Sequence, residues 1–186
     1  MVAVARPHHL LVPGETAILD GSKSWSADGK VLRYDWTFTD GTTAAGPTLQ
    51  RKYDRPGVYS EVLKATDAAG HVGIDFAVVQ VVDPNGPAPP RLHVAHYPTQ
   101  GIRPGDAVTF KVRAFGTTHG RETLDFGDGS PPDVLASDGG VDPLAKAGYA
   151  VTTHRFAKPG CYVVTARRAN EHGIEAVMRT CVIVEP

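Results

Sequence analysis

The sequence has few cysteines, no excess of charge of one sign and no long apolar run. Lysine and arginine total 19 against 20 aspartates and glutamates, so no bulk field draws in nucleic acid or an anionic membrane. No apolar stretch approaches the roughly 20 residues that span a bilayer. We therefore predict no nucleic-acid partner and no membrane span.

The start of the chain, Met1 to Arg6, lacks the basic segment and long apolar core of a signal peptide. It has the alternating apolar character of a strand. We expect the chain to be part of a longer polypeptide.

Motifs of common catalytic sites are also missing. The sequence has no Gly-x-Ser-x-Gly elbow, no His-Glu-x-x-His pair and no phosphate-cradling glycine loop. Asp125 and Asp128 could pass for a carboxylate pair, but an earlier copy of the same motif has Thr37 in place of Asp125. We predict no catalytic residues and a chain that is not itself an enzyme.

Short β-rich runs separated by turn residues fill the chain. Ala17-Ile18-Leu19, Val31 to Trp36, Val58 to Ala65 and Phe76 to Val82 are such runs, and Pro-Gly, Asp-Gly and Ala-Gly pairs punctuate them. No stretch keeps a helical period for three turns. This spacing predicts an all-β sandwich or barrel.

The turn motifs occur twice, which predicts two domains. Trp36 to Gly41 matches Leu124 to Gly129, and Pro56-Gly57-Val58-Tyr59 matches Pro159-Gly160-Cys161-Tyr162. Four prolines lie between Pro84 and Pro90, which suits an extended, semi-rigid linker. We predict a first domain at 1–83, a linker at 84–90 and a second domain at 91–186 with an inserted loop around 130–153.

The two cysteines lie in the last predicted strand pair. If that hairpin turns around Asn170-Glu171-His172-Gly173, Cys161 and Cys181 lie directly opposite each other. Opposed residues in an antiparallel pair are close enough for a disulfide after small adjustment. The alternative is a pair of free, packed thiols. A disulfide would indicate an oxidising location: extracellular, cell-surface or periplasmic.

The ordered motifs resemble the PKD (polycystic kidney disease) domain, an immunoglobulin-like β-sandwich. The first domain carries nearly the whole pattern, and the second matches best at Asp125 to Gly129 and His154 to Tyr162. In order, the motifs of the first domain are Pro13-Gly14-Glu15, Leu19-Asp20-Gly21-Ser22, Asp28-Gly29, Tyr34-x-Trp36-x-Phe38-x-Asp40-Gly41, Pro56-Gly57-x-Tyr59 and Val62-x-Lys64-Ala65-Thr66-Asp67.

The resemblance implies the fold class, which is all-β with two immunoglobulin-like, PKD-type antiparallel β-sandwiches in tandem. It also implies a non-catalytic accessory module, because such domains accompany secreted glycoside hydrolases, polysaccharide lyases and proteases. The module would bind a polysaccharide or a fibrous protein, or space a catalytic domain of a larger extracellular hydrolase or lyase. The alternative is an adhesin-type or structural module that binds another protein.

Loop aromatics and the insertion supply the candidate ligand-binding residues. Flat rings stack on sugars or anchor protein interfaces, and long loops on a rigid sandwich often recognise ligands. The alternatives are that these rings cap their own cores and that the loop is a mobile surface feature. The candidates are Trp25, Phe115, Tyr149, Asp133, Asp138 and Asp142.

Calcium is the one cofactor that the resemblance suggests, and none is required. Some PKD domains bind Ca²⁺ through an Asp-x-Asp-Gly loop, whereas Ser26-Ala27-Asp28-Gly29 keeps only the second aspartate. Hard cations need six to eight oxygen ligands. Asp20, Asp28 and Asp67 form the candidate set, and solvated turn aspartates are the alternative.

Overall fold

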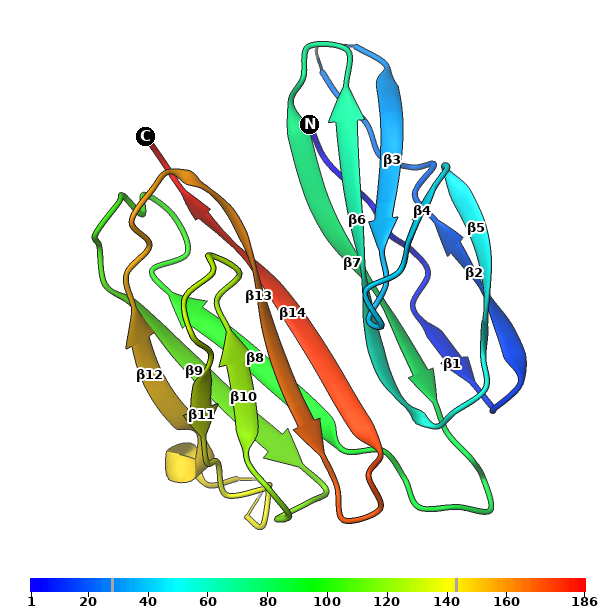
Figure 1. Cartoon of the computed structure of the whole chain (residues 1–186), viewed down its shortest axis with the longest axis vertical. Coiled ribbons are helices and arrows are strands. Elements are labelled where there is room, and N and C mark those ends of the chain that lie inside the picture. Colours follow the sequence, from blue (N-terminus) through cyan, green and yellow to red (C-terminus); the bar gives the residue numbers. More distant parts are fainter. Residues whose placement is uncertain (28, 143) are drawn as a thin grey trace. The chain divides into compact units, whose positions relative to one another are not determined.

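The computed structural model describes residues 1–27, 29–142 and 144–186. The chain divides into two compact units, unit 1 at Met1–Ala88 and unit 2 at Pro89–Pro186. Each unit is a β-sandwich (Figure 1), which confirms the predicted fold class of two immunoglobulin-like sandwiches. Among the residues described, no helix has the length and apolar character to cross a membrane.

Unit 1 packs a larger sheet against a two-stranded one. The larger sheet has the order β1-β7-β6-β3-β4, in which β1 and β7 are parallel and the other pairs antiparallel. The second sheet is the antiparallel pair β2-β5. The strands are β1 (His9–Leu11), β2 (Glu15–Asp20), β3 (Val31–Thr37), β4 (Thr43–Ala45), β5 (Thr48–Tyr53), β6 (Gly57–Asp67) and β7 (Val72–Val81).

The core of unit 1 follows the two-residue period of its strands. Trp36 and Leu63 from the larger sheet and Leu19 from the smaller one are fully buried. The indole Nε1–H of Trp36 donates to the carbonyl of Gly46 at 3.0 Å, so the one polar atom of this ring is satisfied. Alternation in β2, β3 and β6 therefore places the core where the sequence predicts it.

Unit 2 has two sheets in the same arrangement. One has the order β14-β13-β10-β11 and the other the order β12-β9-β8, all antiparallel. Phe110, Phe126 and Phe156 are buried between them. The elements are β8 (Arg91–Tyr97), β9 (Val108–Phe115), β10 (Glu122–Asp125), β11 (Asp133–Leu135), the 3-10 turn η1 (Lys146–Gly148), β12 (Ala150–His154), β13 (Gly160–Ala169) and β14 (Glu175–Val184).

Both units carry a tyrosine corner after their Pro-Gly turn. The hydroxyl of Tyr59 donates to the carbonyl of Arg55 at 2.9 Å, and that of Tyr162 donates to the carbonyl of Lys158 at 2.8 Å. The same four-residue reach in both units matches the corner of immunoglobulin-like sandwiches. The repeated Pro-Gly-x-Tyr motif thus forms the same hydrogen bond in both units.

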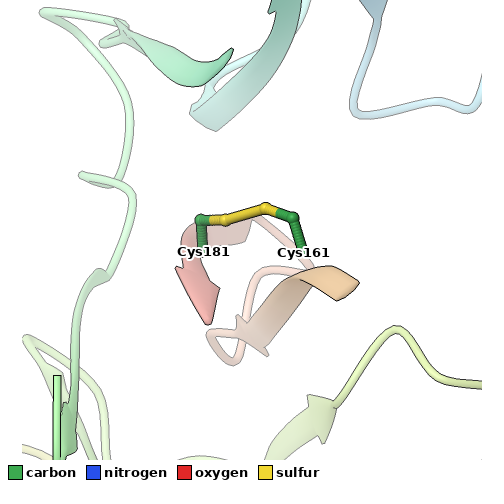
Figure 2. The surroundings of a disulfide bond; sticks show 2 residues. All are labelled: Cys161 and Cys181. Atoms are coloured by element: carbon green, nitrogen blue, oxygen red, sulfur yellow. A yellow bond between two sulfur atoms is a disulfide. The ribbon is translucent and has the colours of Figure 1, made fainter. Parts of the chain in front are cut away.

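Cys161 and Cys181 form a disulfide across β13 and β14, with their Cα atoms 6.4 Å apart (Figure 2). The predicted register was wrong by two residues, because Cys161 pairs with Ile183 and Cys181 with Val163. The bridge is therefore diagonal and not between directly opposed residues. The cause is a longer turn, since the Asn170 amide accepts from the Ile174 N–H and the last strand pair is Ala169 with Glu175.

Candidate functional site

The structural difference between the two units lies between β11 and β12. In unit 1, Gly46 and Pro47 alone separate β4 from β5, whereas residues 136–149 separate β11 from β12 in unit 2 (Figure 1). Pro143 of this segment lies outside the described residues. We call residues 136–149 the inserted segment, and it contains the predicted candidates Asp138, Asp142 and Tyr149.

A buried arginine holds the inserted segment on the sheet. Arg113 points outward from β9, yet only 2% of it is exposed because the segment covers it. Its Nε and Nη2 donate to Oδ1 and Oδ2 of Asp138 at 2.8 and 2.6 Å, in a bidentate pair. Its Nη1 and Nη2 also donate to the carbonyls of Ala145 and Asp142 at 3.1 and 2.5 Å.

Two aromatic rings lie near the same guanidinium. The Arg113 Cζ is 5.0 Å from the ring centre of Phe115 and 5.5 Å from that of Tyr149, distances at which a cation is attracted to a ring. The Tyr149 hydroxyl is 2.9 Å from Nδ1 of His93. Hydrogen bonds from Arg113 lower the pKa of Asp138, so its carboxylate stays ionised.

Four of the predicted ligand-binding residues, Phe115, Asp138, Asp142 and Tyr149, thus meet around Arg113. Sequence reasoning did not single out Arg113. The sequence does contain one signal that points to Arg113. It is a basic residue at an outward strand position, and the insertion that could pair with it is rich in aspartate. The other two candidates, Asp133 and Trp25, are not part of this cluster. Asp133 accepts from the Thr152 hydroxyl at 2.5 Å, and Trp25 belongs to unit 1.

A second anchor fixes the start of the inserted segment. The Ser137 hydroxyl donates to Oε1 of Glu122 at 2.5 Å and accepts from the Ala114 N–H at 3.0 Å. Glu122 is fully buried, and its Oε1 is 2.9 Å from Nη1 of Arg168, which is also buried. Because Glu122 and Arg113 both lie in the interior, the segment is tied to the sandwich at two successive residues.

The anchored segment forms one wall of a hollow of about 550 Å³. The other walls come from the loop after β9 and from Glu171 in the turn between β13 and β14. We call this hollow the loop pocket, and its lining residues are Gly116, Thr117, Thr118, His119, Gly139, Gly140, Val141 and Glu171.

Two consecutive glycines allow the wall to fit this closely. Gly139 and Gly140 have φ angles of +70° and +76°, in the left-handed region that favours glycine. A Cβ on Gly139 would lie 2.2 Å from the carbonyl oxygen of Thr117, and one on Gly140 would lie 2.7 Å from the Phe115 ring. The loop pocket therefore depends on glycine at both positions.

Polar groups around the loop pocket suit a ligand rich in hydroxyl or amide groups. The Thr117 hydroxyl donates to Oε2 of Glu171 at 3.2 Å, while Thr118 and His119 are exposed. The pKa of Glu171 is lowered by its own backbone N–H first and then by Thr117, so the pocket presents a carboxylate acceptor. Hydroxyl, imidazole and carboxylate groups converge on one hollow, as in pockets that orient small polar ligands.

Trp25 is an exposed ring on a fixed backbone. It is 56% exposed, and its N–H and carbonyl both pair with Val2, at 3.0 and 2.8 Å. This ring does not cap the core of unit 1. It offers a surface for stacking, separate in the sequence from the loop pocket.

The candidate calcium ligands serve turns. Asp67 accepts from the Ser26 hydroxyl and from the N–H groups of Ala69 and His71, and the bond from Ser26 is the largest influence that lowers its pKa to about 2. Asp20 accepts from the N–H of Ser22 at 2.8 Å. Asp28 lies outside the described residues. Across 1–27, 29–142 and 144–186, no three His, Cys, Asp or Glu side chains gather as a metal site.

The equivalent turn in unit 2 supports this structural role. Asn170 stands where unit 1 has Asp67, and its side-chain oxygen accepts from the N–H groups of His172 and Ile174 at 3.0 Å each. A neutral amide thus closes the same turn as the carboxylate of Asp67. The negative charge is not needed for the turn.

The Asp-Gly motif also proves to be architectural. Asp125 accepts from the Gly127 N–H at 2.8 Å, and Asp128 accepts from the hydroxyl and N–H of Ser130 at 2.6 and 3.0 Å. The second oxygen of Asp128 is 2.7 Å from Nε2 of His154. Both carboxylates are therefore occupied in shaping the turn, as the comparison of the two sequence copies indicates.

Comparisons with known proteins find a family model that matches part of the chain. Residues 2–81 match the family model of the PKD domain. The chain is similar to the collagenase ColA of Clostridium perfringens (strain 13 / Type A), with 28% identity over 81 residues, which are 44% of this chain and 7% of that protein. The chain thus corresponds to a small part of this curated relative.

Among solved structures, the chain is similar to a carbohydrate-binding module of the β-sandwich superfamily, with 15% identity, a TM-score of 0.42 and coverage of 100% of this chain and 92% of that one. It is also similar to the fibronectin(III)-like modules of Clostridium thermocellum CbhA, with 12% identity, a TM-score of 0.36 and coverage of 96% and 90%. At these values neither likeness bears on function. The motifs of unit 1 agree with the match of residues 2–81 to the PKD domain model.

Proposed function

We propose that the chain is a non-catalytic accessory module of a secreted or cell-surface protein, which binds a polysaccharide or a fibrous protein and spaces a catalytic domain. In this proposal, unit 2 is a second PKD-type domain modified for binding. Support comes from the order β7-β6-β3-β4, which β14-β13-β10-β11 repeats, from the tyrosine corner of both units, and from the similarity of part of the chain to a small part of a collagenase.

The observation that carries the proposal is the anchored inserted segment. Unit 1 joins the equivalent strands with Gly46 and Pro47 alone, whereas unit 2 buries Arg113 and Glu122 against a longer segment. A pocket that is formed before the ligand arrives avoids the entropy cost of ordering its walls during binding. Loops held by a rigid sandwich are a common position for recognition sites.

The chemistry of the loop pocket fits repeated polar units along a polymer. Sugar hydroxyls or peptide amides would bond to Thr118, His119 and the carboxylate of Glu171. The hollow of about 550 Å³ has room for a small number of such units, with the rest of the polymer outside. A collagen-like protein is one such ligand, since part of the chain is similar to part of a collagenase.

The disulfide supports the location that the proposal requires. Disulfides persist in oxidising compartments and are rare in the cytosol. The bridge between Cys161 and Cys181 ties the last two strands of unit 2. We therefore place the module outside the cytoplasm: extracellular, on the cell surface or in the periplasm.

Binding of the purified chain to a glycan array and to fibrillar collagen tests the proposal. We expect retention on one polymer class and about a tenfold loss of affinity in the His119→Ala variant, which removes a polar contact from the pocket wall. The matched control is His172→Ala, because His172 is an exposed neighbour that does not line the pocket. Equal loss in both variants, or no retention on any polymer, contradicts the proposal.

A further inference from the structure

A second surface of unit 2 lies on the outward side of β8, β9 and β12. Strand pairing arranges its outward residues in rows, with Tyr97, Thr109 and Thr153 in one row and Ala95, Lys111 and Val151 in the next. The residues between these positions, such as Phe110 and Val112, are buried in the core. We call these six outward residues the Tyr97 face.

The Tyr97 face offers a flat ring beside a shallow hollow. Tyr97 is 77% exposed, more than an ordinary packed tyrosine, so its ring is free to stack on a ligand. A hollow of about 220 Å³ lies beside it, lined by Ala95, His96, Tyr97, Thr109 and Lys111. The small side chain of Ala95 leaves space between the ring and Lys111.

The charge of this face has one sign. Strands β8, β9 and β12, which the structure describes in full, contain no Asp or Glu. The cross-strand neighbours of Lys111 are Ala95 and Val151, neither of which carries charge. The next basic residue along β9, Arg113, is already paired with Asp138. Lys111 is therefore a cation beside the hollow. Its neighbours on the adjacent strands do not neutralise its charge.

We propose that the Tyr97 face binds an acidic polysaccharide, a chain of uronic acid residues. Such a chain combines an apolar ring face for Tyr97, hydroxyls for Thr109 and Thr153, and a carboxylate for Lys111. Charge complementarity favours this ligand over a neutral glycan. A nucleic acid fits less well, because the whole chain has a net charge of −1 and the positive charge is local. The inference rests on the proposed binding function and names its ligand class.

Affinity electrophoresis or calorimetry of the whole 186-residue chain with polygalacturonate tests the inference. The control ligand is fully methyl-esterified polygalacturonate, which keeps the sugar and removes the charge. We expect Tyr97→Ala to weaken binding about tenfold and Lys111→Met about fivefold. The control variant Lys64→Met removes an exposed lysine of β6 in unit 1 and should bind as the wild type does. About 0.5 M NaCl, where the screening length is roughly 4 Å, should also weaken binding.

The outcomes separate this inference from the broader function. Equal affinity for the esterified ligand, or equal effects of Lys111→Met and Lys64→Met, overturns the inference. Equal affinity for single-stranded DNA also overturns it, because the face would then be a general polyanion surface. If His119→Ala abolishes binding of another polymer while Tyr97→Ala has no effect on any, the inference fails and the proposed function stands. If no polymer binds, both fail. All these side chains are exposed, and circular dichroism verifies that each variant is folded.

Discussion

The two units bury different residues at the same place. Unit 1 carries Glu61 on β6 where unit 2 carries Val164 on β13, and both side chains are fully buried. Around Glu61, the Tyr53 hydroxyl donates to Oε1 at 2.9 Å, and the N–H and hydroxyl of Thr39 donate to Oε2 at 2.6 and 2.9 Å. The environment of Val164 has no need of these donors.

The partners have changed together with the buried residue. Phe156 of unit 2 replaces Tyr53, and Gly127 replaces Thr39, so the two hydroxyls that donate to Glu61 have no counterpart near Val164. The N–H of Gly127 donates to Asp125. Burial raises the pKa of Glu61 despite these hydrogen bonds, and burial followed by the effect of Glu61 raises the pKa of Tyr53. A polar cluster around Glu61 in unit 1 and an apolar cluster around Val164 in unit 2 thus fill the same site. Each buried residue fits only the neighbours of its own unit.

Around the Asp-Gly turn the two units keep one arrangement. Arg51 lies 4.0 Å above the ring of Phe38 and bonds to Asp40 at 2.5 Å. His154 stacks on Phe126 with ring centres 3.9 Å apart and bonds to Asp128 at 2.7 Å. Both units therefore use a cationic or polar group that stacks on a ring and bonds to the aspartate of the Asp-Gly turn. The buried acid occurs in unit 1 and is not shared.

Glu61→Val should have the largest effect on stability. The substitution gives unit 1 the buried residue of unit 2 without its neighbours. It leaves the buried Tyr53 hydroxyl without its acceptor and removes the acceptor of the Thr39 N–H. We expect a loss of about 3 kcal/mol in the free energy of unfolding. Both tryptophans of the chain, Trp25 and Trp36, belong to unit 1, so tryptophan fluorescence in urea reports this unit.

The paired variant Tyr53→Phe with Glu61→Val tests whether the clusters are exchangeable. Removing the stranded hydroxyl should recover about 1 kcal/mol relative to Glu61→Val alone, which is a favourable coupling between the two sites. Purely additive losses would mean that Tyr53 and Glu61 contribute independently. The comparison between the units would then be a coincidence of sequence and not an exchange of clusters.

The next prediction concerns how acid changes the stability that the two turn aspartates, Asp40 and Asp128, contribute. Burial alone would raise the pKa of Asp128, but hydrogen bonds from Ser130 and His154 outweigh it and lower the value to about 2. Hydrogen bonds from Thr42, followed by those from Arg51, lower the pKa of Asp40 to about 2 as well. Because the folded pKa lies below the unfolded value of 3.8, each carboxylate stabilises the fold above about pH 4, and this contribution is lost as the pH falls toward 2.

Their different solvent exposure should make the two aspartates contribute unequally to stability. The Asp128 side chain is 14% exposed and that of Asp40 is 53% exposed, so solvent screens Asp40 more. At pH 7 we expect Asp128→Asn to cost about 2 kcal/mol and Asp40→Asn less than about 1 kcal/mol. Hydrogen exchange of the β13 amides follows unit 2, and fluorescence follows unit 1. A cost of Asp128→Asn that persists unchanged at pH 2 would exclude the ionised carboxylate as its cause.

Local chemistry made the sandwich framework predictable. Strand alternation, Pro-Gly turns and the Tyr that follows each depend on residues a few positions apart, and the structure has them where the motifs stand. The register of β13 and β14 was predicted wrongly because it depends on the turn, and the Asn170 amide closes a longer turn than the Gly173 position suggests. With this turn, the cysteines take diagonal and not opposed positions.

The loop pocket was predictable only in part. An insertion is visible when the repeats are compared, and so are its aspartates. Which aspartate meets Arg113 depends on how residues 136–149 fold back on the sheet, and no periodicity in the sequence encodes that path. Buried Glu61 and Glu122 were hidden for a related reason. Each lies two residues from a buried leucine, Leu63 or Leu124, on the core side of its strand. Its charge nevertheless favours the solvent side unless its distant partners are known.

Loss of the tyrosine corner should have the same small effect in both units. Tyr59→Phe and Tyr162→Phe each remove one hydroxyl that donates to a backbone carbonyl four residues earlier, and the ring remains. We expect each to cost about 1 kcal/mol, the net value of one such hydrogen bond. Tyr97→Phe is the control and should cost less than about 0.5 kcal/mol, because its ring is 77% exposed. Equal losses in the two corners would show that the frame common to both sandwiches is independent of the clusters that distinguish them. A loss confined to Tyr59 would instead tie the corner to the neighbouring Tyr53, whose ring centre lies 4.9 Å from that of Tyr59.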